Sequence, residues 1–196
     1  MKKAGIIIAA LLCASLVWGG FYLVKHRADT HSGEDKQLTA VEKIIMKDLE
    51  NNYPKTPRAV VKLYNQIISV YYGQEYTDEE FEQLTTQARL LMDDALLENN
   101  PLDDYRKAVK NDVFYYKNRS RTIRQTDVCD TNEVQYLTDK SNGDRLAYVT
   151  ASYFVQEKEE FDKTYQKYVL RQDSEGRWKI LSYYQIKGEL SEQDDE

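Results

Sequence analysis

The hydrophobic and polar positions divide the chain into three parts with different periods. Residues 4–24 form an apolar segment without a charge. From there to about residue 113, a polar stretch is followed by apolar residues that recur every three or four positions, the spacing of amphipathic helices. After about Val113 apolar and polar residues alternate, which is typical of strands with one buried face. The pattern therefore predicts an α+β protein behind an apolar N-terminal segment.

The apolar segment Ala4–Val24 is long enough to cross a bilayer. As a helix it would span about 31 Å, against a hydrocarbon core of about 30 Å. Three interpretations compete: an uncleaved anchor, a cleaved signal peptide and a lipoprotein signal. The apolar run continues past the weak cleavage candidate at residues 13–15, and Cys13 follows two leucines rather than a small residue. We therefore expect residues 4–24 to be a membrane anchor, with residues 1–3 in the cytoplasm.

The rest of the chain is expected to lie outside the cytoplasm as a tether, a domain and a tail. Residues 25–36 are polar and lack an apolar run, which predicts a flexible tether. Residues 37–188 carry the helical and strand patterns and form the expected domain. Residues 189–196 are mostly acidic, which predicts a disordered tail. The expected protein is thus single-pass in the cell membrane, with an extracytoplasmic C-terminal domain.

Capping signals mark the helix starts in the first half of the domain. Thr39 and Thr77 are each followed three residues later by Glu, which is the spacing of a capping box. Thr56 precedes Pro57 as an N-cap does, and Gly73 stands where a C-cap is expected. These signals predict helices over about residues 39–49, 56–73, 77–98 and 101–110.

Five segments with a period of two predict strands in the second half of the domain. They are residues 121–130, 133–138, 145–155, 163–171 and 177–186. Turn sequences at Ser141–Asp144 and Asp173–Gly176 predict hairpins. Helices followed by antiparallel strands predict an α+β domain whose helices pack on one face of a curved sheet.

The order helix, helix, short helix, then strands ending in Gly176-Arg177-Trp178-Lys179-Ile180 resembles the nuclear-transport-factor-two-like cone fold. In that fold a bent sheet wraps a long helix, which here would be residues 56–73. The resemblance covers about residues 56–187, and the helix from Thr39 would be an addition. The chain also resembles uncharacterised, singly anchored surface proteins of Gram-positive bacteria. Because cone-fold domains often dimerise through the sheet, the resemblance implies a homodimer.

Composition excludes several chemistries. The net charge is −6, and it is −8 beyond residue 24, because two of the 27 basic residues precede the anchor; we therefore expect no nucleic-acid partner. Both histidines, His26 and His31, lie in the tether, so the domain has no imidazole for a catalytic triad or a His-based zinc site. Cys129 is the only cysteine of the domain, and no phosphate-binding glycine motif occurs. We expect no cofactor and no metal, and we assign no catalytic residue.

Three residues of the predicted strands are candidates for a ligand pocket. Alternation places Tyr153 and Tyr184 on the apolar faces of their strands, where they would line a cone interior. Asp127 could supply a carboxylate, because some cone-fold enzymes use a pocket carboxylate as general base. The alternatives are ordinary core packing for the tyrosines and a solvated strand edge for Asp127.

These observations favour a membrane-anchored extracytoplasmic binding or interaction module that is not an enzyme. Besides the membrane, which it contacts through residues 4–24, its partner would be a protein, a cell-envelope polymer or a small ligand. The alternative is an isomerase- or hydratase-like enzyme that uses Asp127 and a pocket tyrosine. A deep pocket containing a carboxylate would favour the enzyme, and a closed, tyrosine-filled interior would count against it.

Overall fold

The computed structural model describes residues 38–187. The expected cytoplasmic tail, membrane anchor and tether (residues 1–36) and the expected acidic tail (residues 189–196) lie outside the described residues. Within residues 38–187, no helix combines the length and the apolar character needed to span a membrane. The predicted α+β class is confirmed for this part of the chain, which contains helices and a curved antiparallel sheet.

The helices come first along the chain, as predicted. They are α2 (Ala40–Ile45), α3 (Pro57–Gly73), α4 (Asp78–Leu90), α5 (Asp94–Asn99) and α6 (Leu102–Asn118). Thr39 and Thr77 form the expected capping boxes. Thr56 caps α3 by accepting a hydrogen bond from the N–H of Ala59, at 3.2 Å. The local capping chemistry therefore fixes where three of the helices begin.

The strands form one antiparallel sheet in the order β1-β3-β4-β5, and β2 also pairs with β3. They are β1 (Arg121–Val128), β2 (Gln135–Thr138), β3 (Arg145–Glu157), β4 (Glu160–Gln172) and β5 (Trp178–Ile186), with a short 3-10 helix, η1 (Thr131–Glu133), before β2. The pairing register shifts by one residue at Arg124 in β1 and at Leu181 in β5. Such bulges increase the local twist and bend of a sheet.

Three helices differ from the sequence-based expectation. The helix expected over 39–49 is shorter, because α2 ends at Ile45. The single helix expected over 77–98 is broken into α4 and α5, because Met92 leaves the helix to form a parallel bridge with Ile180 of β5. The N–H of Asp93 also donates to the carbonyl of Ile180, at 2.9 Å. The last helix, α6, extends to Asn118 rather than ending near Lys110. The longer α6 adds helical surface that contacts β1.

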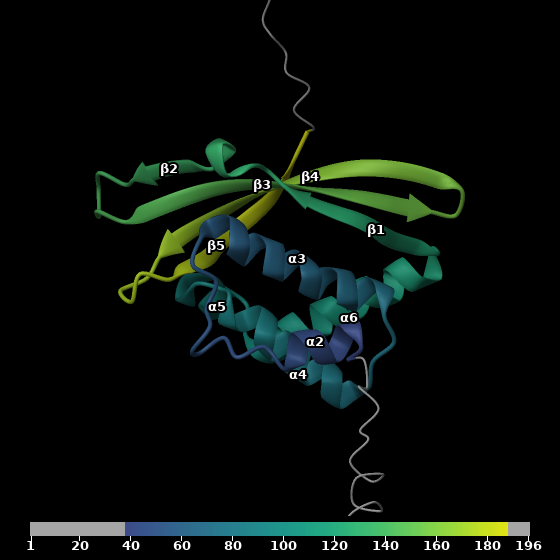
Figure 1. Cartoon of the computed structure of the whole chain (residues 1–196). Helices are drawn as coiled ribbons and strands as arrows, with labels where there is room; N and C mark the ends of the chain where they lie inside the picture. The colour runs from purple at the N-terminus through teal and green to yellow at the C-terminus, as the bar shows by residue number, and fades with distance from the viewer. Residues whose placement is uncertain (1–37, 188–196) are drawn as a thin grey trace, which may run out of the picture. The chain divides into compact units, whose positions relative to one another are not determined.

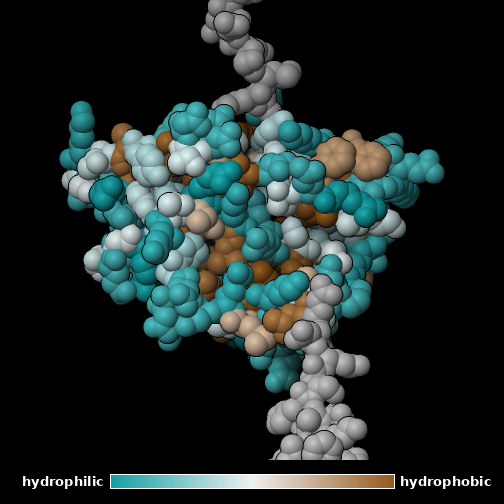
Figure 2. Space-filling view, viewed as in Figure 1, coloured by the Kyte–Doolittle hydropathy of each residue, from teal (hydrophilic) through white to brown (hydrophobic). Residues whose placement is uncertain are grey.

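The helices cover one face of the sheet (Figure 1), with α3 lying along it and α2 and α4 on the far side of α3. We call this side the inner face; on β3 it carries Ala147, Val149, Ala151, Tyr153 and Val155, all buried. The intervening β3 residues, from Tyr148 to Phe154, lie on the outer face, which no described helix covers. In Figure 2 apolar side chains gather in the middle of this view, framed by polar ones.

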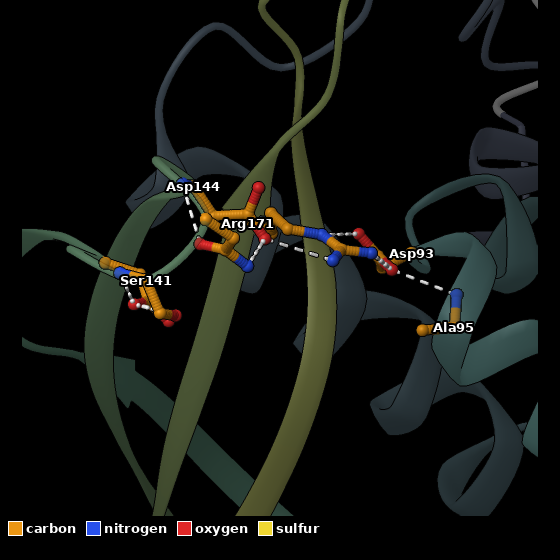
Figure 3. Close-up of polar contacts among 7 residues, drawn as sticks. Asp93, Ala95, Ser141, Asp144 and Arg171 are labelled. Atoms are coloured by element: carbon orange, nitrogen blue, oxygen red, sulfur yellow. Dashed lines mark hydrogen bonds and ion pairs between the residues drawn. The ribbon is translucent and has the colours of Figure 1, made fainter.

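Ion pairs connect the start of α5 to the sheet (Figure 3). The Arg171 guanidinium of β4 donates from Nε to Asp93 Oδ2 at 2.9 Å, and from Nη1 to Asp144 Oδ2 at 3.2 Å. Asp93 is 5% exposed and also caps α5 by accepting from the N–H of Ala95. One arginine thereby holds together the start of α5, strand β4 and the β2–β3 turn.

Candidate functional site

A cavity of about 190 Å³ lies between α3, α6 and the inner face of the sheet. Its lining is dominated by tyrosines, namely Tyr64, Tyr71, Tyr72, Tyr105, Tyr116, Tyr153 and Tyr183. Ile68, Val109, Ile123 and Val155 supply the apolar lining, and Asp112, Thr164 and Gln166 the remaining polar groups. A concave site lined by aromatic side chains with a few converging polar groups is a common form of small-ligand site.

Helical periodicity explains how α6 contributes to this lining. Tyr105, Val109, Asp112 and Tyr116 are spaced by four, three and four residues, which places them on one face of a helix. Helix α3 contributes in the same way through Tyr64, Ile68 and Tyr71, which follow one another at intervals of about one helical turn. The cavity is therefore formed where two amphipathic helices meet the inner face.

Three buried side chains form a hydrogen-bonded network beside the cavity. The Tyr153 hydroxyl donates to Asn65 Oδ1 at 2.6 Å and forms a second hydrogen bond with the Tyr168 hydroxyl. The Tyr168 hydroxyl also lies 3.1 Å from Gln166 Oε1. Burial raises the pKa of Tyr153 and of Tyr168 above the ordinary tyrosine value. These phenols are therefore neutral at physiological pH and act in positioning and packing.

The Tyr71 hydroxyl differs from these neighbours because no described residue lies within ordinary hydrogen-bond geometry of it. Tyr71 is only 2% exposed and lines the cavity. A buried polar group left without a partner costs about 1–3 kcal/mol. Burial also raises the pKa of Tyr71, so the hydroxyl keeps its proton and can donate it. The hydroxyl of Tyr105, which also lines the cavity, contributes to this shift in the pKa of Tyr71 as a weak hydrogen-bond acceptor.

Among residues 38–187, Asp112 is the only carboxylate that lines the cavity, and no Lys, Arg or His of this range does so. Its side chain is exposed, which places it at the mouth rather than in the interior. Burial and, less strongly, the negative charge of Asp112 raise the pKa of Tyr72. Burial likewise raises the pKa of Tyr105 to about 12. The lining is thus neutral apart from one negative charge at its mouth.

Of the two candidate tyrosines, the structure places Tyr153 at the cavity and Tyr184 outside it. Tyr184 is 50% exposed and pairs across the sheet with Lys167 on the outer face. The one-residue bulge at Leu181 reverses the alternation of β5, so Tyr183 takes the inner position opposite Tyr168. The expectation that Tyr184 faces the interior is corrected to Tyr183.

Asp127 lies on the outer face, away from the tyrosine-lined cavity. It pairs with Ser152 of β3, whereas its neighbour Thr126 pairs with the inward Tyr153. Its Oδ2 accepts a hydrogen bond from Gln125 Nε2 at 2.8 Å. The structure therefore does not bring Asp127 and Tyr153 together as an acid–base pair, because adjacent strand positions point to opposite faces.

A second hollow, of about 560 Å³, lies on the outer face between β1, the 129–134 loop and β3–β4. Asp127, Asp130, Glu133 and Lys167 line it together with Cys129. Glu133 already accepts from the Asp130 N–H at 2.6 Å, and Asp130 lies 3.8 Å from the Arg58 guanidinium. Burial raises the pKa of the Cys129 thiol, which disfavours the reactive thiolate. Within residues 38–187, no cluster of His, Cys, Asp and Glu is arranged to hold a metal ion.

The sequence contained a signal for two of the residues that were missed. Asp112 and Tyr116 continue the periodicity of Tyr105 and Val109, and an expected helix that ran past Lys110 would have included them. No comparable signal exists for Tyr183, since the bulge that turns it inward depends on pairing with β4.

Comparison with known families gives one match that covers most of the chain. The model of a family described as "Domain of unknown function (DUF6715)" matches residues 1–183. The chain therefore belongs to that family. No curated protein matches the chain.

Proposed function

We propose that this DUF6715 protein is a membrane-anchored, extracytoplasmic and non-enzymatic binding module that holds a small ligand between α3, α6 and the sheet. The observation that carries the proposal is the tyrosine-lined cavity with the unpartnered Tyr71 hydroxyl. A ligand that accepts a hydrogen bond from Tyr71 would offset the cost of that buried donor. The apolar segment 4–24 supports the membrane anchor.

The binding part of the proposal is tested by recovering what the cavity holds. The full-length chain is purified in maltoside micelles, and its small-molecule content is measured by mass spectrometry. Val109→Trp fills the cavity, whereas Lys107→Trp places the same ring on an exposed position of α6. We expect a compound that accompanies the wild type and Lys107→Trp in near-stoichiometric amount and is depleted in Val109→Trp. Equal recovery from the two variants, or none from the wild type, would contradict the proposal.

The topology is tested with an impermeant thiol reagent on intact cells. In a Cys129→Ser background, a cysteine replaces either Asn142, in the exposed β2–β3 turn, or Lys3, before the anchor. We expect Asn142→Cys to be labelled on intact cells and Lys3→Cys only after permeabilisation. The reverse pattern would place the domain in the cytoplasm.

The finer fold assignment is part of the proposal. We propose that residues 37–188 form a nuclear-transport-factor-two-like cone, because the long helix α3 lies along the inner face of a sheet bent by two bulges. An experimental structure in which the sheet wraps around α3 would support the cone. A flat sheet with α3 at its edge would contradict it.

The enzyme alternative has less support from the geometry. Its proposed base, Asp127, is on the outer face, and the one carboxylate at the cavity, Asp112, is exposed at the mouth. A general base must come within hydrogen-bond reach of the proton that it abstracts. Interaction with a protein or envelope polymer and homodimerisation remain predictions, tested by crosslinking in intact membranes and by the oligomeric state of the purified chain.

A further inference from the structure

We infer that the ligand of the tyrosine-lined cavity is a small organic cation with a quaternary ammonium group. This inference rests on the proposed binding function and adds the chemical class of the ligand. Its basis is a neutral aromatic lining combined with a single carboxylate at the mouth, Asp112.

The aromatic lining suits a cation. Aromatic rings carry negative potential on their faces, and cages of such rings are the usual means of holding quaternary ammonium groups. Two lining tyrosines already contact cations of the protein: the Arg121 guanidinium lies 4.9 Å from the Tyr116 ring centroid and the Arg89 guanidinium lies 5.6 Å from that of Tyr105. Neither arginine lines the cavity. Because Tyr116 also stacks on Tyr72, at a centroid distance of 4.2 Å, a ligand would meet the rings of the other lining tyrosines.

The carboxylate at the mouth is not neutralised by the protein. Asp112 forms no ion pair within residues 38–187, although basic residues lie nearby on α6. Lys110 pairs with Asp78 at 2.8 Å, and Lys117 pairs with Glu75 at 3.1 Å. A cationic ligand would supply the counter-charge that Asp112 lacks. An anion would meet this negative charge at the mouth with no basic side chain to hold it.

The volume of the cavity and its polar groups restrict the class of ligand further. A volume of about 190 Å³ is equivalent to roughly six water molecules, so the cavity suits a compact head such as trimethylammonium. The Tyr71 hydroxyl provides one donor for an oxygen atom of the same ligand. A phosphate attached to the head would approach Asp112, so the structure favours a free organic cation over a phosphocholine lipid head.

The test compares three probes by titration calorimetry on the full-length chain in maltoside micelles at constant ionic strength. They are choline, phosphocholine and neohexyl alcohol, the uncharged isostere in which carbon replaces the nitrogen of choline. We expect choline to bind about tenfold more tightly than neohexyl alcohol, and more tightly than phosphocholine. Equal binding of choline and the isostere would overturn the inference and leave the proposed binding function intact. Tighter binding of phosphocholine would overturn the assignment to a free cation.

Two matched pairs of variants locate the site. Asp112→Asn should weaken choline binding about threefold to tenfold without affecting the isostere, whereas Asp104→Asn, on an exposed position of the same helix, should not affect either. Tyr183→Leu should weaken choline binding, whereas Tyr184→Leu, on the outer face, should not. All four positions are exposed, so the variants are expected to fold. No choline binding, or the same loss in both members of a pair, would overturn the inference, while ligand recovery tests the proposed function separately.

Discussion

Strand β4 presents two tyrosines three residues apart in opposite environments. Tyr168 points to the inner face, is fully buried and hydrogen-bonds with Tyr153, whereas Tyr165 lies on the outer face beside Lys163. Tyr183 and Tyr184 on β5 likewise lie on opposite faces, although both are exposed. The residue type is identical within each pair, so the difference in role comes from the face and not from the chemistry of the side chain. Tyrosine content alone therefore gives no information on where a site lies.

The largest expected effect is on the free energy of unfolding. It is measured by replacing one tyrosine on the inner face of β4 and, in a separate variant, one on the outer face. Tyr168→Ala should lower the free energy of unfolding by about 3–5 kcal/mol, because it opens a cavity and leaves hydrogen-bonding groups of Asn65 and Tyr153 without their partner. Tyr165→Ala should lower it by about 1 kcal/mol or less. Urea unfolding of the full-length chain in micelles measures both. Similar losses would mean that the two faces contribute equally to stability.

A smaller effect is expected where the half-buried Arg171 of β4 pairs with the buried Asp93 at the start of α5. Arg171→Met should cost about 2–4 kcal/mol, because it leaves the carboxylate of Asp93 buried without a counter-charge. Arg177→Met should cost about 0–1 kcal/mol, since its partners Asp173 and Glu175 lie in the β4–β5 turn. Adding Asp93→Asn to Arg171→Met should restore part of the loss. No recovery would show that Arg171 acts through packing alone.

Alkaline pH should destabilise the inner face. The expected loss in the free energy of unfolding is intermediate among these predictions. Burial raises the pKa of Tyr105 from 10.0 to about 12, so the folded state favours the neutral phenol. Its contribution, roughly 2–3 kcal/mol, is fully present below pH 10 and is lost as the pH rises toward 12. Unfolding followed at several pH values should show this loss, and Tyr105→Phe should reduce the slope over that interval. An unchanged slope in the variant would assign the alkaline loss to other groups.

The smallest effect is expected at an aromatic pair on the outer side. The rings of Phe154 and Phe161 stack at a centroid distance of 5.3 Å, but their side chains are 39% and 57% exposed. A double-mutant cycle of Phe154→Ala and Phe161→Ala should give a coupling of about 0.5–1 kcal/mol. A coupling above about 2 kcal/mol would show that the outer face is covered in solution.

Local signals predicted most of the fold. Thr56-Pro57 and Gly73 gave the ends of α3, and the alternation of β3 gave its inner residues, because capping and face selection depend on nearby residues. The break between α4 and α5 could not be predicted in this way. It depends on the bridge from Met92 to Ile180, which are far apart in sequence.

The candidate site was predicted only in part for the same reason. Tyr153 was identified because β3 keeps a regular alternation across the cavity. Tyr183 was missed because the bulge in β5 arises from its register with β4. The position of Asp127 on the outer face likewise follows from the bulge at Arg124, which shifts the pairing of β1 with β3.

The bulge in β5 decides which side chain of this strand lines the cavity. Without it, pairing continued regularly from Ile180 would place Ser182 opposite Tyr168. Deletion of Leu181 would give regular pairing and still leave Tyr183 opposite Tyr168, because the deleted residue is the one that the bulge leaves unpaired. The strand can therefore lose that residue and keep an aromatic ring at the cavity, whereas loss of the bulge in the intact strand would replace the ring by a serine.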